Sequence, residues 1–252
     1  MSPSRRSMSN LIHLVRSAAR VASAAATLVI LTGCGAIVSS APQSQVRVVT
    51  VSPDAPRLDI YQDANPLAHN LGFGTVTSYI PISPGSGTIA ANTAGTRQLL
   101  SISKPNFVAS GQYTVLIGNA AANMQQLTLT DQSQPAPSGD IALRFIDQAT
   151  RVGATDVYLV PAGQKLTTIT PLVTNLPFGG NTGYLNIPTG TYSFVMLPTG
   201  TIPSSAIAAP YTGPQVTYSA TSAHTVILID QQLPSTPGLQ VITASDFDPV
   251  AN

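Results

Sequence analysis

The amino-acid sequence predicts an all-β protein made of two tandem antiparallel β-sandwich domains. The first observation behind this prediction is composition: 21 prolines and 19 glycines punctuate the chain, Thr, Val, Ile and Tyr are plentiful, and Glu and Trp are absent. Such a composition favours short strands joined by turns over long amphipathic helices. The second observation is an internal repeat that spans most of the chain.

The offset of the repeat grows along the chain, from 97 to 105 and then to 111 residues, as loop insertions would produce. The matched residues include Arg47 with Arg144, Asp59 with Asp156, Tyr79 with Tyr184, and Tyr113 with His224. We assign one domain to each copy. The predicted segments are a leader at 1–33, a tether at 34–44, a first sandwich at 45–130, a linker at 131–139, a second sandwich at 140–246 and a tail at 247–252.

The leader has the features of a cleaved signal peptide. Four arginines precede an apolar run from Val21 to Leu31, which is too short for a typical membrane span and suits a secretory signal. The run ends in Leu31-Thr32-Gly33-Cys34, which resembles the lipobox of bacterial lipoproteins, where the cysteine is acylated and becomes the first mature residue. The alternative is a free thiol, which would be an unpaired reactive group in an exported chain.

The resemblance to lipoproteins implies a lipid anchor at Cys34 with more than one acyl chain, because a single chain holds a protein only marginally. Gly35, in place of an aspartate, favours the outer membrane of a bacterial cell envelope. The mature chain would carry seven basic residues against ten aspartates, a formal charge of −3, and its basic residues are scattered. We therefore expect no nucleic acid as a partner. The expected partners are the membrane, through the anchor, and an unidentified envelope protein or polysaccharide.

Within the first copy, residues 46–51 read as a strand, residues 52–56 as a proline turn and residues 58–61 as a second strand. Further along, Tyr113 opens a strand two residues after a glycine, which resembles the tyrosine corner of immunoglobulin-like sandwiches, where the phenol bonds backbone upstream. His224 occupies the corresponding position of the second copy, and we assign it either a corner role as well or a half-buried packing role.

These residues lead to a known family. The run from Val46 to Tyr61, followed by Leu71-Gly72-Phe73-Gly74 and Tyr79, resembles the domain of unknown function 4397, which is found in bacterial cell-envelope proteins and often in tandem. The first copy carries the resemblance over residues 46–118, and the second departs from it at residues 147–151. The resemblance implies exported immunoglobulin-like modules without established catalytic residues.

The charges that recur in both copies are interpreted as structural pairs. Arg47 and Asp59 lie symmetrically about Pro53, and Arg144 and Asp156 have the same spacing in the second copy. If the flanking strands form a hairpin, the two charges face each other and contribute about 0.2–1 kcal/mol. The alternative is a shared binding site.

Three aspartates at 54, 59 and 63 could be read as calcium ligands, but their spacing matches no compact loop. We therefore predict neither a metal nor a cofactor. Tyr192, Tyr211 and Tyr218 have no counterpart in the first copy and are candidate partner contacts, with core packing as the alternative.

The mature chain holds only two histidines, His69 and His224, and neither lies near a nucleophile motif. We predict no catalytic residue. The sequence favours a non-catalytic cell-envelope lipoprotein of two sandwich modules with a structural, adhesive or ligand-presenting role. The alternative is a carbohydrate- or peptide-binding accessory module, and a hydrolase is the third reading.

Overall fold

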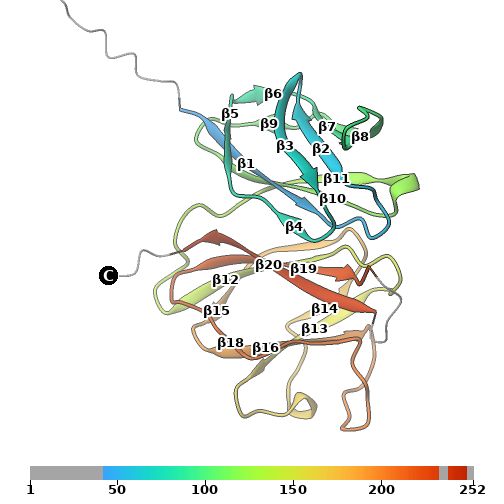
Figure 1. Ribbon diagram of the computed structural model, residues 1–252. Helices are drawn as coiled ribbons and strands as arrows, with labels where there is room; N and C mark the ends of the chain where they lie inside the picture. Colours follow the sequence, from blue (N-terminus) through green and yellow to red (C-terminus); the bar gives the residue numbers. More distant parts are fainter. Residues whose placement is uncertain (1–41, 233–237, 249–252) are drawn as a thin grey trace, which may run out of the picture. The chain divides into compact units, whose positions relative to one another are not determined.

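The computed structural model describes residues 42–232 and 238–248. Cys34, the predicted leader and most of the tether lie outside the described residues, as do the last four residues of the predicted tail. The regular structure of the described chain is almost entirely strands, arranged in several sheets, so the predicted all-β sandwich class is confirmed (Figure 1). No helix among the described residues is both long and apolar enough to cross a membrane.

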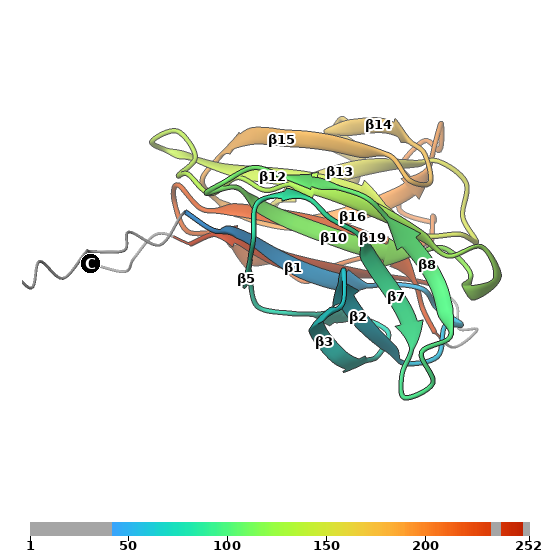
Figure 2. The same cartoon turned by 90° about the horizontal axis from the view of Figure 1, so that it is seen from above.

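The first segment, residues 42–131, forms an inner and an outer sheet. The inner sheet has the order β11-β10-β1-β4, with β5 also paired to β1, and the outer sheet has the order β3-β2-β7-β8 (Figure 2). The strands are β1 (Ser44–Thr50), β2 (Leu58–Gln62), β3 (Asn65–Leu71), β4 (Thr75–Val76), β5 (Ile80–Ile82), β7 (Ile89–Thr93), β8 (Leu99–Ser103), β10 (Gln112–Gly118) and β11 (Gln125–Thr130). A ribbon of β6 (Gly85–Ser86) with β9 (Asn106–Phe107) and the 3-10 turn η1 (Ala121–Asn123) complete it.

The second segment, residues 140–248, repeats this plan. Its inner sheet has the order β15-β12-β19-β20 and its outer sheet the order β14-β13-β16-β17, with β18 also paired to β16. The elements are β12 (Asp140–Asp147), β13 (Thr155–Pro161), η2 (Leu166–Thr168), β14 (Val173–Leu176), β15 (Asn181–Pro188), β16 (Thr191–Pro198), β17 (Tyr211–Thr212), β18 (Val216–Thr217), β19 (Ala223–Asp230) and β20 (Leu239–Phe247).

One strand pair in each inner sheet is parallel, which departs from the purely antiparallel sheets that the sequence predicts. In the first segment β1 runs parallel to β10 and places Arg47 opposite Thr114, and in the second β12 runs parallel to β19 and places Arg144 opposite Thr225. All other pairs among the described strands are antiparallel. Parallel neighbours need a long connection, and most of each segment provides it.

Strand β1 is buried on both faces. Val46 and Val48 point into the core between the inner and outer sheets of the first segment. The alternate residues Val49 and Val51 point the other way, into a cluster that includes Ile227 and other apolar side chains of the second segment. The period-two geometry of a strand sends successive side chains to opposite faces, so the nearly continuous apolar run of β1 has a direct structural cause.

The apolar cluster between the two inner sheets belongs to both segments. Its buried members are Val49, Val51, Leu116, Leu129, Ile146, Ile227 and Ile229. The whole of Pro42–Asn252 accordingly forms one compact unit. The segments keep their own sheets, but they share this cluster, so we expect the stability of each to depend on the other.

Separating the segments should cost more stability than cutting a flexible linker. Residues 42–139 and 140–248, expressed apart, would each expose half of the shared cluster, and a fully buried Val or Leu contributes about 1.5–3 kcal/mol. We expect a single cooperative thermal transition for the intact chain by circular dichroism, and a lower midpoint or no transition for each part. Two parts that melt at the midpoint of the intact chain would contradict the shared core.

Candidate functional site

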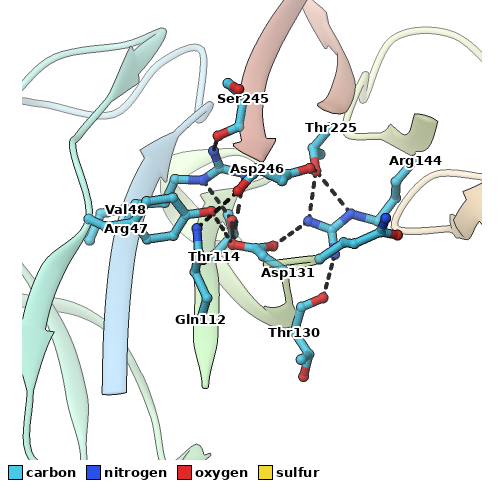
Figure 3. Close-up of polar contacts among 12 residues, drawn as sticks. Arg47, Val48, Gln112, Thr114, Thr130, Asp131, Arg144, Thr225, Ser245 and Asp246 are labelled. Carbon is cyan, nitrogen blue, oxygen red and sulfur yellow. Dashed lines mark hydrogen bonds and ion pairs between the residues drawn. The ribbon is translucent and has the colours of Figure 1, made fainter. Parts of the chain in front are cut away.

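Arg47 extends from β1 towards the second segment. Its Nε donates to Thr114 Oγ1 on the neighbouring strand (2.8 Å), its Nη1 donates to the backbone carbonyl of Ser245 (2.6 Å), and its Nη2 donates to the Asp246 carboxylate (Figure 3). The side chain is almost completely buried. All three nitrogens of the guanidinium therefore have an acceptor, two of them in the other segment.

Arg144 makes the same set of bonds in the opposite direction. Its Nε donates to Thr225 Oγ1 (3.0 Å), its Nη1 to the backbone carbonyl of Thr130 (2.9 Å) and its Nη2 to Asp131 Oδ1 (2.5 Å). Asp131 follows β11 directly and belongs to the first segment. Each arginine is thus bound by the aspartate of the other segment, and we call this arrangement the exchanged Arg–Asp pairs.

Each aspartate is also held by its own segment. Asp131 Oδ2 accepts hydrogen bonds from the hydroxyls of Thr114 (2.6 Å) and Tyr79 (2.8 Å). Asp246 Oδ2 accepts the equivalent bonds from Thr225 and Tyr184 at 2.7 and 2.8 Å. A carboxylate that is fully buried is stable only when its lone pairs are satisfied in this way.

The tyrosines of this network stack against the arginines. The Arg47 guanidinium lies 5.0 Å from the centre of the Tyr79 ring, and that of Arg144 lies 4.7 Å from the centre of the Tyr184 ring. Burial, and next the Asp131 carboxylate, raises the pKa of Tyr79; burial also raises the pKa of Tyr184. Both phenols stay protonated at neutral pH, as their donor role requires. Burial raises the pKa of Asp246, and the Arg47 charge opposes that shift.

The predicted pairing of Arg47 with Asp59, and of Arg144 with Asp156, is wrong. The prediction assumed that the proline turn joins two strands of one hairpin. Instead the chain crosses between sheets at that turn, so that β1 lies in the inner sheet and β2 in the outer sheet. The residues are structural, as predicted, but with different partners.

Asp59 joins the end of β3 to the turn between β7 and β8. Its carboxylate accepts the backbone N–H groups of Asn70 (2.8 Å) and Gly95 (3.1 Å), both of which have positive φ angles of 57° and 75°. The Asn70 bond and then the Gly95 bond lower the pKa of Asp59. Asp156 accepts the equivalent two N–H groups of the second segment at 2.8 and 3.0 Å. This aspartate thus recurs because it binds two backbone N–H groups in each segment.

The tyrosine corner at Tyr113 is confirmed. Its hydroxyl accepts a hydrogen bond from the backbone N–H of Val108 at 2.9 Å. A Cβ on Gly111 would lie 2.6 Å from the Tyr113 ring, which explains the glycine two residues before the corner. His224 makes no such bond to backbone, because its shorter ring reaches only the hydroxyl of Ser222 at 2.9 Å. The corner role of His224 is therefore wrong, and the alternative describes it: the half-buried ring packs 5.2 Å from the Tyr218 ring.

The three candidate tyrosines of the second segment pack against its core. Tyr218 is 6% exposed, and burial raises its pKa to about 12. Tyr192 and Tyr211 are half-buried beside the same core, and the Tyr192 hydroxyl donates to the carbonyl of Pro188 (2.7 Å). All three side chains therefore pack against the core of the second segment, which was the alternative to a contact with a partner.

Neither histidine forms a base–nucleophile contact with a serine among the described residues. The Ser222 hydroxyl donates its proton to the carbonyl of Ser219 (2.7 Å), so the imidazole of His224 must donate to Ser222 rather than activate it. His69 is 59% exposed, with Nδ1 3.4 Å from Asp59 Oδ1 and its ring edge-on to Tyr61. Desolvation lowers the pKa of His224 and favours the neutral ring.

The aspartates that could be read as calcium ligands accept hydrogen bonds from backbone N–H groups instead. Asp54 accepts the N–H of Ala121, and Asp63 accepts the N–H of Thr88, each at 2.8 Å. Within residues 42–232 and 238–248, no group of three or more His, Cys, Asp or Glu side chains is arranged to hold a metal ion.

Sequence reasoning missed Asp131 and Asp246. Residues 131–139 lack apolar periodicity and therefore resemble a linker, and the repeat described above ends at an offset of 111. The offset grows once more, to 115, and then aligns Thr130 with Ser245 and Asp131 with Asp246. That further step was the available signal.

Comparison with known proteins gives a family match over part of the chain. Residues 44–158 match the model of DUF4397, a domain of unknown function. The match runs from β1 through most of β13, which covers the first segment and the start of the second. No curated protein matches the chain.

Two solved structures resemble the chain distantly. One is a carbohydrate-binding module of family CBM26 from Eubacterium rectale in complex with maltoheptaose, with a TM-score of 0.25 and 10% identity over 82% of this chain and 98% of that one. The other is a streptococcal virulence factor described as binding α-glucan, with a TM-score of 0.24 and 8% identity over 76% of this chain and 95% of that one. At these TM-scores the likeness does not extend to a ligand for this chain.

A second group of buried carboxylates lies in the second segment. Asp147 is fully buried, and its Oδ1 accepts the N–H of Ala149 (2.8 Å). Burial raises the pKa of Asp147 to about 6, the Ala149 bond opposes the shift, and the nearby Asp230 carboxylate adds to it. The folded state therefore binds a proton at pH values where the unfolded chain has released it.

Replacing one member of an exchanged Arg–Asp pair should be strongly destabilising. Arg47→Met leaves Asp246 buried without its counter-charge, and such a loss costs about 3–5 kcal/mol. The double variant Arg47→Met with Asp246→Leu should cost less than the sum of the two single variants in urea unfolding. The control is Arg57→Met, an exposed arginine of the same segment, with an expected change within about 0.5 kcal/mol. Additive effects of the pair would contradict the coupling.

Asp147 should make stability depend on pH in a defined window. Because its folded pKa lies above the unfolded value, its contribution is fully present below about pH 4 and is lost as pH rises to about 6. Asp147→Asn should remove this slope, so the variant gains stability relative to the parent between pH 4 and 6 in urea unfolding. Asp59→Asn is the opposite control: the pKa of Asp59 is lowered, so its contribution is lost as pH falls. A pH-independent difference for Asp147→Asn would contradict the assignment.

Proposed function

We propose that the chain is a non-catalytic lipoprotein of the bacterial cell envelope, in which two tandem copies of the DUF4397 type act as one rigid module that presents a ligand-binding surface. The exchanged Arg–Asp pairs are the observation that carries this proposal. They join the two copies through buried, paired charges. Interfaces between independent domains, by contrast, usually allow relative motion.

Rigidity follows from the cost of opening the interface. Moving the copies apart would separate Arg47 from Asp246 and Arg144 from Asp131, and would expose the shared apolar cluster. A module of this kind has little conformational entropy to lose on binding, so it suits the presentation of a preformed surface.

The anchor is proposed from the sequence around Cys34. The tether at 34–44 reaches at most about 40 Å when it is fully extended, so the module would stay close to the lipid surface. An outer-membrane position, favoured by Gly35, would place it where envelope polymers and partner proteins are accessible.

The side chains with acid–base potential also fit a non-catalytic role. The buried aspartates hold arginines or backbone N–H groups, and the Ser222 hydroxyl is donated to a carbonyl. These contacts support a structural role for the buried aspartates and Ser222, which are the residue types that a hydrolase would use.

The proposal is tested by the state of the mature N-terminus. In a diderm host, mass spectrometry should find acylated Cys34 as the first residue of the membrane-bound protein, because the lipobox directs both acylation and cleavage. Cys34→Ser should stay unprocessed or become soluble. Gly35→Asp is the matched variant, which should keep the acyl chains and shift the protein to the inner membrane. Soluble wild-type protein with a free Cys34 thiol would overturn the proposal.

A further inference from the structure

The two copies differ most on the outer faces of their outer sheets. In the second segment this face is apolar, and Tyr158, Val160, Val195 and Leu197 form a buried cluster there. The chain covers the cluster with its own loops: Leu166 and Ile169 follow β13, and Ala209 follows β16.

In the first segment the same face is open. The strand registers place Tyr61 opposite Ala90 and Asp59 opposite Asn92, as Tyr158 lies opposite Val195 and Asp156 opposite Leu197. The positions of the buried cluster are therefore occupied by Tyr61, Asp63, Ala90 and Asn92. The loops that would cover them are short, because residues 63–64 alone join β2 to β3, and residues 94–98 join β7 to β8.

An open cavity of about 220 Å³ lies on this face. It is lined by Tyr61, Asp63, Ala64, Ala90, Asn92 and Arg97. Where the second copy fills the space with its own apolar side chains, the first copy leaves it free and surrounds it with polar groups.

Asn92 gives the sharpest indication of a ligand. Its Oδ1 is the one buried side-chain polar atom without a hydrogen-bond partner among the described residues. An unsatisfied buried acceptor destabilises the folded state, and the fold does not need an amide here, since the equivalent residue is the fully buried Leu197. A ligand hydroxyl in the cavity would supply the missing donor.

Two charged residues at the cavity have free hydrogen-bonding capacity. Arg97 lies in a turn with a φ of 58° and makes no hydrogen bond or ion pair with the described residues. Asp63 uses Oδ1 for the N–H and hydroxyl of Thr88, and these bonds lower its pKa, so the carboxylate is ionised and Oδ2 remains as an acceptor. The site thus offers donors and acceptors with no net charge.

We propose that this cavity binds a sugar unit of a neutral glycan, which deepens the proposed function and rests on it. A sugar hydroxyl can donate to Asn92 Oδ1 or Asp63 and accept from Arg97, while its apolar face packs on the Tyr61 ring. Beside the cavity, Leu99 and Ile102 are 52% and 57% exposed on β8, opposite Asn92 and Ala90, and extend the apolar surface for an adjoining sugar.

Other ligand classes fit this site less well. A phosphate or sulfate would meet the Asp63 carboxylate. A peptide that adds a strand needs a free sheet edge, whereas β2 and β7 lie inside the sheet between β3 and β8.

The test is affinity electrophoresis of the detergent-solubilised mature protein through gels that contain starch, a β-glucan or a mannan, with hyaluronan and plain gels for comparison. We expect retardation by at least one neutral polysaccharide. Asn92→Leu installs the residue of the second copy, so it should keep or raise the unfolding midpoint while it weakens binding at least tenfold. Tyr61→Ala should weaken binding similarly, and Arg57→Gln, outside the cavity, should leave it unchanged.

No retardation by any neutral polysaccharide, retardation by hyaluronan alone, or unchanged binding by Asn92→Leu and Tyr61→Ala would each overturn the inference. The outcome is separable from that of the proposed function. Acylated, membrane-bound protein without glycan binding would contradict only the inference, and glycan-binding protein with an unmodified Cys34 would contradict only the anchor.

Discussion

The structure depends on two buried arginines that are each neutralised by the other half of the chain. Burying a guanidinium and a carboxylate is costly, and the pair offsets that cost only with good geometry and further hydrogen bonds. Here each aspartate receives a threonine and a tyrosine hydroxyl from its own half as well as the arginine of the other. The apolar cluster beside the network could tolerate sliding, whereas four directional groups per pair fix one register between the inner sheets.

The repeat itself was readable from the sequence, and so was the class of fold. Strand periodicity, turn residues and the glycine before Tyr113 are local features that single-sequence reasoning handles well. The partners of Arg47 were not readable, because strands that are neighbours in sequence belong to different sheets, and the arginine meets a residue 199 positions away. Local pattern cannot distinguish a hairpin turn from a crossing between sheets when both contain proline.

The candidate ligand site was hidden for a different reason. Asn92 is an unremarkable polar residue in sequence, and its meaning appears only when strand register aligns it with Leu197 of the second copy. Internal repeats therefore serve as a built-in comparison. Where both copies keep a residue, as with Asp59 and Asp156, it supports the scaffold, and where one copy replaces a buried leucine by an unsatisfied amide, selection for folding alone gives no explanation.

The order in which the chain is completed has a consequence for folding. Asp246 lies on the last strand, β20, and its partner Arg47 lies on the first, so the hydrogen bonds that join the Arg47 guanidinium to the second segment can form only when almost the entire chain is present. Contacts of such long sequence separation form slowly, and they leave incomplete chains with exposed apolar surface. Completion of the fold is therefore delayed until the last strand is present. A chain truncated near its end would keep this apolar surface exposed and would be accessible to proteases.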